Sequence, residues 1–140
     1  MKLDEFINTY SGKKIDFDNY CGAQCVDLVR QYWKDVGGIK EHTGAVQGAK
    51  DLFLKYNQME GEKKFFNALS AWQARTGDVI VWNGTNTNPY GHVAIVIGIT
   101  DENLLVFEQD GYKQDGAKFK TRSFDNVLGV LRLKEIHRGR

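Results

Sequence analysis

Cys25 is the residue whose type and position best suit covalent chemistry. It lies near the start of a helix expected over residues 23–36, where unpaired backbone N–H groups and the helix dipole favour an anion. Because the thiolate is the reactive form of cysteine, this position favours a nucleophile. A buried structural thiol is the alternative, and it is the commoner state of a free cysteine. We interpret Cys21, the other cysteine, as a packing residue or a bystander without a role in the chemistry.

The twelve residues from 16 to 27, which include Cys25, carry oxygen ligands at the offsets of a calcium-binding loop. Window positions 1, 3, 5, 7 and 12 are filled by Asp16, Asp18, Tyr20, Gly22 and Asp27. Three carboxylates and two backbone carbonyls in this pattern suit a calcium ion. A cysteine at position 6 and an aspartate at position 12 depart from the standard EF-hand loop. An Asp/Asn turn that starts a helix is the alternative interpretation.

The cation window and the nucleophile can coexist on one helix. Cys25 and Asp27 are two residues apart, so their side chains leave a helix ~200° apart in projection. Asp27 can then face the loop while Cys25 faces the opposite side. A bound cation would fix the start of the helix without touching the sulfur.

His92 is the histidine best placed to act as a base for the thiol, which needs a base held in position. His42 and His137 stand among polar and charged residues, whereas His92 opens an apolar strand directly after a turn. Glu108 follows the next strand, and an antiparallel hairpin would return it to the level of His92. A carboxylate there would accept the second ring N–H and fix the tautomer. A structural histidine and a solvated strand-end carboxylate are the alternatives.

Asp110, two residues after Glu108, is a second candidate for orienting the ring. On a regular strand both side chains would leave on the same face. A turn at residues 110–111 would swing Asp110 off that face. We therefore expect Glu108 to be the principal orienter and Asp110 to give secondary support.

The elements that must position these residues are helices followed by strands. Three segments have the apolar spacing of helices, namely residues 2–10, 23–36 and 43–56. Five short β-rich runs separated by turn formers follow, at residues 78–82, 93–99, 104–107, 117–123 and 127–133. This order predicts an α+β fold, with N-terminal helices packed on a C-terminal antiparallel β-sheet of five or six strands.

Length and composition limit the class of protein. The length of 140 residues predicts one domain over residues 1–140, and the hydrophobic fraction of 41% is ordinary for a soluble globular chain. A net charge of +1 gives no sign of a nucleic-acid partner. We find no apolar run near the ~20 residues that span a bilayer, and no apolar signal-peptide core at the start. We expect a monomer with neither a nucleic-acid nor a membrane partner.

Four segments give the chain a resemblance to the CHAP family of cysteine- and histidine-dependent amidohydrolases and peptidases: residues 24–28, 77–82, 91–96 and 107–109. The resemblance implies a papain-like fold and the hydrolysis of bacterial peptidoglycan. The chain is most similar to CHAP domains of phage endolysins from Gram-positive hosts, which carry a calcium loop before the nucleophile. It thus implies Ca²⁺ at the five window positions. It also implies a lysis protein made in the host cytoplasm without a signal peptide, which acts on the cell wall.

By this resemblance, Cys25 attacks an amide or peptide carbonyl of Gram-positive peptidoglycan and His92 transfers the proton. The backbone N–H of Cys25 is the expected oxyanion donor, helped by the Gln24 side chain. Asp110 departs from the family pattern, which often has asparagine there, so the group that finally orients the ring stays open. The choice between amidase and endopeptidase also stays open. The rival hypotheses are a calcium-dependent wall-binding module with a degenerate active site and a bacterial thiol peptidase of wall remodelling.

Overall fold

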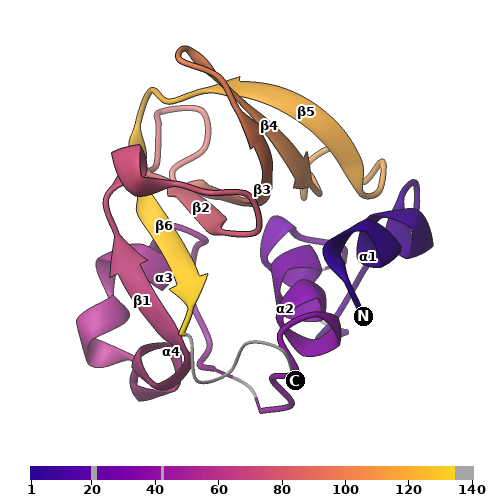
Figure 1. The fold of residues 1–140 in the computed structure, drawn as a ribbon, viewed down its shortest axis with the longest axis horizontal. Helices are drawn as coiled ribbons and strands as arrows, with labels where there is room; N and C mark the ends of the chain where they lie inside the picture. Colours follow the sequence, from indigo (N-terminus) through magenta and orange to yellow (C-terminus); the bar gives the residue numbers. More distant parts are fainter. Residues whose placement is uncertain (20–21, 42, 135–140) are drawn as a thin grey trace.

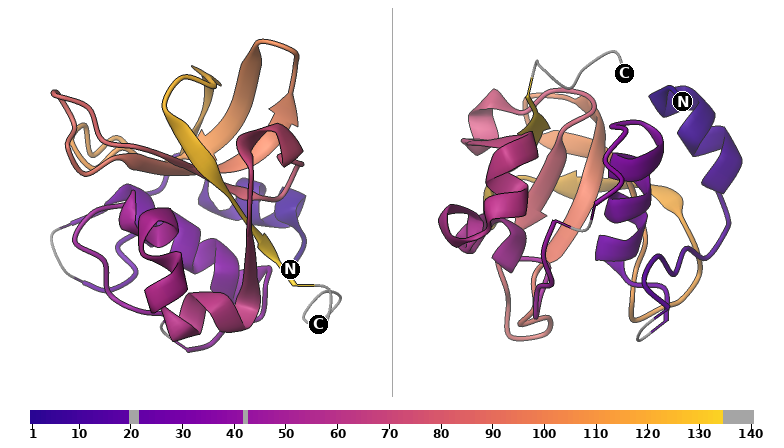
Figure 2. Two further views of the ribbon diagram at one scale, coloured as in Figure 1. Left: turned by 90° about the vertical axis from the view of Figure 1, so that its left-hand side faces the viewer. Right: turned by 90° about the horizontal axis from the view of Figure 1, so that it is seen from below.

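The computed structural model describes residues 1–19, 22–41 and 43–134. Within these residues the helices are α1 (Leu3–Tyr10), α2 (Cys25–Asp35), α3 (Asp51–Leu54) and α4 (Glu60–Phe65), with 3-10 turns η1 (Tyr56–Gln58) and η2 (Ala71–Gln73). The strands are β1 (Phe66–Leu69), β2 (Val79–Trp82), β3 (His92–Ile99), β4 (Asn103–Glu108), β5 (Lys118–Ser123) and β6 (Val127–Leu133). The α-helices gather on one side of the strands (Figure 1; Figure 2). No helix in this part of the chain is long and apolar enough to cross a membrane.

The strands form one antiparallel sheet in the order β1-β6-β2-β3-β4-β5. The expected α+β fold, with helices packed on an antiparallel sheet, is confirmed. β1 is not among the strands expected from the sequence. It pairs with β6, with Phe66 opposite Leu133 and Leu69 opposite Val130. Four residues directly after a helix are too few for a clear alternation of side chains, so only the pairing defines this strand.

Side-chain alternation along the strands divides the core into two clusters. The first cluster joins the helices to the sheet and includes Phe6, Leu28, Val29, Val81, Val93 and Ile95. The second covers the other face of the sheet and includes Ile80, Ala94, Val96, Leu104 and Val106. His92 is two residues from Ala94 on β3, and Glu108 is two residues from Val106 on β4, so each pair lies on one face of the sheet. Both side chains therefore leave the sheet on the side of the second cluster.

The prediction of a helix over residues 43–56 is wrong for most of that segment. Only α3 is α-helical there, and residues 43–50 are irregular or turned. Tertiary contacts override the apolar spacing, because the Gly44 carbonyl accepts a hydrogen bond from Arg30. The Lys50 N–H also donates to the Tyr90 carbonyl at 3.0 Å. The loop that leads into His92 thus shapes this segment.

Glu62 on α4 is a buried carboxylate. It is 0% exposed, and neither of its carboxylate oxygens has a partner at hydrogen-bond geometry in the described part of the chain. Burial raises the pKa of Glu62 to about 7, although Thr43 and the guanidinium of Arg30 oppose the shift. The folded chain therefore holds the Glu62 proton more tightly than the unfolded chain does. Its stability should fall as the pH rises from about 4.5 to about 7.

We expect Glu62→Gln to remove this loss of stability. At about pH 8 the variant should exceed the wild type by up to about 3 kcal/mol in free energy of unfolding. Well below pH 4.5 the two should melt alike, because Glu62 is then neutral in both the folded and the unfolded chain. Thermal unfolding followed by circular dichroism measures the difference, with exposed Glu60→Gln on the same helix as the control. A variant less stable than the wild type at pH 8 would mean that Glu62 is charged and paired with Arg30.

Candidate active site

α2 begins at Cys25, and hydrogen bonds close its first turn. The Gln24 N–H donates to Asp27 Oδ2 at 2.8 Å, and the Asp27 N–H donates to the Gln24 carbonyl at 3.1 Å. These bonds start the helix at Cys25, which has a free and partly exposed thiol. The sulfur therefore lies at the helix end where a negative charge is favoured.

His92, the first residue of β3, contacts both the thiol and a carboxylate. Its Nε2 lies 3.1 Å from Glu108 Oε1, across the β3–β4 hairpin. Its ring also forms a hydrogen bond with the Cys25 side chain. Because Glu108 engages Nε2, the other ring nitrogen, Nδ1, is left for the thiol.

The charges around His92 favour an ion pair with the thiol. Burial alone would lower the pKa of His92, but the hydrogen bonds and charges of Cys25 and Glu108 raise it to about 9. Burial alone would raise the pKa of Glu108, but hydrogen bonds from Arg122 and His92 lower it to about 2. At neutral pH Glu108 is therefore ionised and the His92 ring carries two protons. This is the form of the ring that pairs with a thiolate.

Arg122 of β5 holds Glu108 from the other side. Its Nε donates to Glu108 Oε1, and its Nη2 donates to Oε2 at 2.7 Å. Glu108 is buried, so this two-pronged contact offsets much of the cost of its charge. Sequence reasoning missed Arg122, and the strand register explains why. The cross-strand partner of Glu108 is Lys118, while that of Arg122 is Leu104, so pairing alone would not join the two.

Asp110 shapes the turn after β4. Its Oδ1 accepts hydrogen bonds from the N–H groups of Tyr112 at 2.8 Å and Lys113 at 3.2 Å. Over residues 1–19, 22–41 and 43–134, Glu108 is the carboxylate that the structure brings into hydrogen-bond contact with His92. Secondary support of the ring by Asp110 stays a prediction.

The Gln24 side chain lies beside the same turn, because a Cβ added at Gly111 would be 2.2 Å from Gln24 Oε1. Its expected role as an oxyanion donor stays a prediction. Four other residues singled out in the sequence lie outside the described residues, namely Tyr20, Cys21, His42 and His137.

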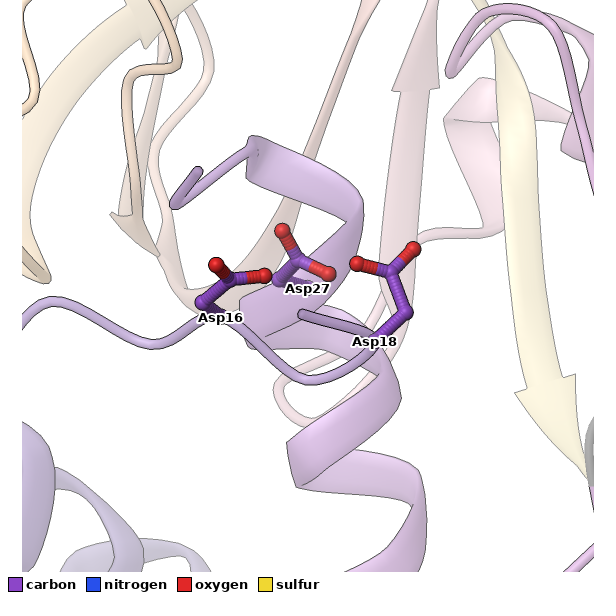
Figure 3. A group of neighbouring side chains, drawn as sticks. All are labelled: Asp16, Asp18 and Asp27. Atoms are coloured by element: carbon purple, nitrogen blue, oxygen red, sulfur yellow. The ribbon is translucent and has the colours of Figure 1, made fainter. Parts of the chain in front are cut away.

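The three carboxylates expected to bind a cation come together beside the start of α2 (Figure 3). One oxygen from each of Asp16, Asp18 and Asp27 lies within 4.8 Å of the other two. Asp27 is buried, and this burial, with the charges of Asp18 and Asp16, raises its pKa to about 6 despite a backbone hydrogen bond at Gln24. Gly22 lies in the connecting loop with φ +72°, a conformation that glycine adopts without strain. Converging carboxylate oxygens fit a hard divalent cation, which offsets their mutual repulsion.

A polar cleft of about 390 Å³ opens beside His92. Its walls come from the loop between β2 and β3 and from β5 with the turn that follows, and they include Trp82, Asn88, Arg122 and Asn126. The ring centroids of Trp82 and His92 lie 5.6 Å apart. Hydrogen-bonding walls beside an aromatic ring can accommodate a substrate rich in amides and hydroxyls.

The CHAP domain family model matches residues 15–110, a stretch that contains Cys25, His92 and Glu108. The chain belongs to the CHAP domain family. Endolysin PlyTW of Staphylococcus phage Twort is 28% identical to this CHAP domain in an alignment of 140 positions that covers 94% of the chain and 29% of that endolysin. The chain thus spans less than a third of the length of this relative.

Solved structures share the fold of this CHAP domain. The endolysin LysIME-EF1 matches with a TM-score of 0.64 and 22% identity, over 94% of this chain and 64% of that one. Ly7917 matches with a TM-score of 0.67 and 16% identity, over 95% of this chain and 62% of that one. A structure of Ly7917 with the hydrolyzing product of MDP matches equally well, over 91% of this chain and 60% of that one. The expected papain-like fold is confirmed by this likeness.

The family match ends at residue 110, so it does not include Arg122, whose guanidinium holds Glu108 in this CHAP domain. In the sequence, Arg122 is the third of three basic residues that alternate along β5, after Lys118 and Lys120. Such a row of charges is typical of a solvated strand face, which is why it did not point to the site.

Proposed function

We propose that this CHAP domain is a peptidoglycan hydrolase that cleaves an amide or peptide bond in the wall of a Gram-positive bacterium. The observation that carries the proposal is the chain of contacts from Cys25 through His92 to Glu108 beside a polar cleft. Similarity to an endolysin of a Staphylococcus phage supports a wall substrate. We infer that residues 1–140 act as one catalytic domain, as a monomer, in lysis of the host.

Each step of the proposed reaction has a residue to carry it. The Cys25 sulfur attacks the carbonyl carbon, and the C–N bond breaks as His92 gives its proton to the leaving amine. Water then attacks the thioester carbonyl while His92 accepts the proton of that water, and the C–S bond breaks to release the new carboxyl group and return the Cys25 thiolate. The Cys25 backbone N–H would donate to the oxyanion, with the Gln24 amide as a second donor. Glu108, kept ionised by Arg122, fixes the orientation of the ring.

We infer that Ca²⁺ binds Asp16, Asp18 and Asp27, together with the backbone carbonyls of Tyr20 and Gly22. The convergence of the three carboxylates supports this inference. When bound, the ion would offset their charges. Because Asp27 also closes the first turn of α2 through the Gln24 N–H, holding Asp27 would fix the helix start that carries Cys25.

A chelator should lower both the melting temperature and the wall hydrolysis, and calcium should restore both better than magnesium does. A site filled at about a hundred times its Kd stabilises the folded state by ~2.7 kcal/mol. Asp18→Ala should abolish the rise in melting temperature on adding calcium, because it removes one of the converging oxygens. Exposed Asp101→Ala, on the β3–β4 turn, is the matched control. If neither chelator nor calcium changes the melting curve, residues 16–27 do not bind calcium and form an ordinary turn at the start of a helix.

Purified Gram-positive peptidoglycan distinguishes the proposed enzyme from a wall-binding module. The wild-type protein should release soluble fragments with new amino groups, and prior alkylation with iodoacetamide should stop the release. A protein that sediments with the wall but releases no amino groups would instead support a calcium-dependent binding module with a degenerate site.

A further inference from the structure

Gln109, the residue after Glu108, joins the end of β4 to two other parts of the site. Its side chain is fully buried. Its Nε2 donates to the Gln24 carbonyl at 2.8 Å and to the Ile15 carbonyl at 2.7 Å, and its Oε1 accepts from the Ile15 N–H at 2.7 Å. Both N–H donors and the oxygen of this amide are therefore used, on partners 85 and 94 residues away in the chain.

Gln114 makes a matching contact with the residue before Gln24. Its Nε2 donates to the carbonyls of Ala23 and Gly111, each at 2.8 Å, and its Oε1 accepts from the Ala23 N–H at 3.2 Å. Two successive residues ahead of Cys25 are thus tied by side-chain amides to the segment that follows Glu108.

These amide contacts bridge the two layers that carry the proposed catalytic groups. Cys25 belongs to a helix, whereas His92 and Glu108 belong to the sheet, so their spacing depends on contacts between the layers. A misplacement of ~1 Å between reacting groups can cost ~10²-fold in rate. Gln109 is next to Glu108 in the chain and hydrogen-bonds the residue before Cys25. It also hydrogen-bonds Ile15, the residue before Asp16, so the same amide holds the entry to the carboxylate loop.

We propose that Gln109 is a positioning residue that sets the start of α2 against the His92–Glu108 pair and couples the carboxylate loop to Cys25. Without its amide, the carbonyls of Ile15 and Gln24 would lose a buried donor, so both segments would shift to find other partners. The effect on turnover rests on the proposed function. The effect on the Cys25 thiol does not, because it can be measured without a substrate.

Gln109→Met removes the amide at nearly constant side-chain length. Gln31→Met is the control, because the Gln31 amide donates to Asp35 near the other end of α2. The first measurement is the rate at which iodoacetamide alkylates Cys25 as a function of pH, which reports the thiolate. We expect Gln109→Met to lower this rate about tenfold near pH 6 and kcat by ~10²-fold, with KM within about threefold. Gln31→Met should match the wild type in all three.

The second measurement is the response to calcium. In the wild type, added calcium should raise both the melting temperature and the alkylation rate of Cys25. In Gln109→Met, calcium should still raise the melting temperature, because the three carboxylates remain. The alkylation rate, however, should respond several-fold less than in the wild type, because the Gln109 contact with Ile15 and Gln24 has been removed and only the contact of Asp27 with the Gln24 N–H still joins the loop to the helix start.

A Gln109→Met protein that melts earlier but keeps the wild-type alkylation profile and kcat would make Gln109 a merely structural residue and overturn the proposal. If that variant does not fold, Gln114→Met makes the same test at Ala23, and we expect it to lower the Cys25 alkylation rate and kcat several-fold. A Gln114→Met protein with the wild-type alkylation profile and kcat would then overturn the proposal. A wild-type protein that releases no fragments from the wall would contradict the proposed function. The alkylation profiles of Cys25 would still test whether Gln109 positions the start of α2.

Discussion

A Cys25→Ala protein should release no fragments from cell-wall peptidoglycan while keeping its far-ultraviolet circular dichroism and its cooperative melting. The thiol is the proposed nucleophile, and loss of a nucleophile lowers turnover by about 10⁶-fold in a well-studied protease. The fold should survive, because Cys25 is partly exposed and the first turn of α2 is closed by Gln24 and Asp27 rather than by the sulfur.

Cys21→Ala is the control for Cys25→Ala, because it removes the other thiol of the chain and should leave hydrolysis intact. Turbidity of purified walls and the release of amino groups measure both variants. Clearance of walls by Cys25→Ala would show that the proposed mechanism is wrong.

Glu108→Gln should lower turnover by up to ~10⁴-fold, the loss seen when the carboxylate that orients a catalytic histidine is removed. The glutamine has the same shape but cannot offer a carboxylate to both His92 and Arg122. Because Glu108 helps to raise the pKa of His92 to about 9, the alkaline limb of the kcat/KM profile should also move to lower pH.

Asp110→Asn makes the same change of charge two residues away and is the matched comparison for Glu108→Gln. Its carboxylate accepts from the N–H groups of Tyr112 and Lys113, so we expect a loss of stability of about 1 kcal/mol and little loss of turnover. Turnover on purified wall, measured below the melting temperature of each variant, separates the two roles. A larger loss for Asp110→Asn would transfer the role of orienter to Asp110.

The parts of the site that depend on local signals could be predicted from the sequence. A helix start near Cys25 follows from the apolar period of the segment after it, and the β3–β4 hairpin follows from two β-rich runs joined by a short turn. Because a hairpin fixes which residues return to the same level, the sequence placed Glu108 near His92, and the structure puts their side chains 3.1 Å apart.

The parts that depend on distant partners could not be predicted. Arg122 reaches Glu108 although its cross-strand partner is Leu104, and Gln109 finds its partners 85 and 94 residues away. Contacts of this kind depend on side-chain reach and on the packing of helices against the sheet, which no local period encodes. The same physics explains the irregular segment at residues 43–50, where contacts with Arg30 and Tyr90 outweigh apolar spacing.

Mass spectrometry of fragments released from purified peptidoglycan in H₂¹⁸O tests most directly whether Cys25 opens an amide bond of the wall. Hydrolysis of a thioester at Cys25 should place one ¹⁸O atom in a new carboxyl group, matched by a new amino group on the other fragment. These labelled fragments should appear with the wild type and be missing with Cys25→Ala. New reducing-end sugars in place of new carboxyl groups, or equal labelling by Cys25→Ala, would contradict the proposed reaction.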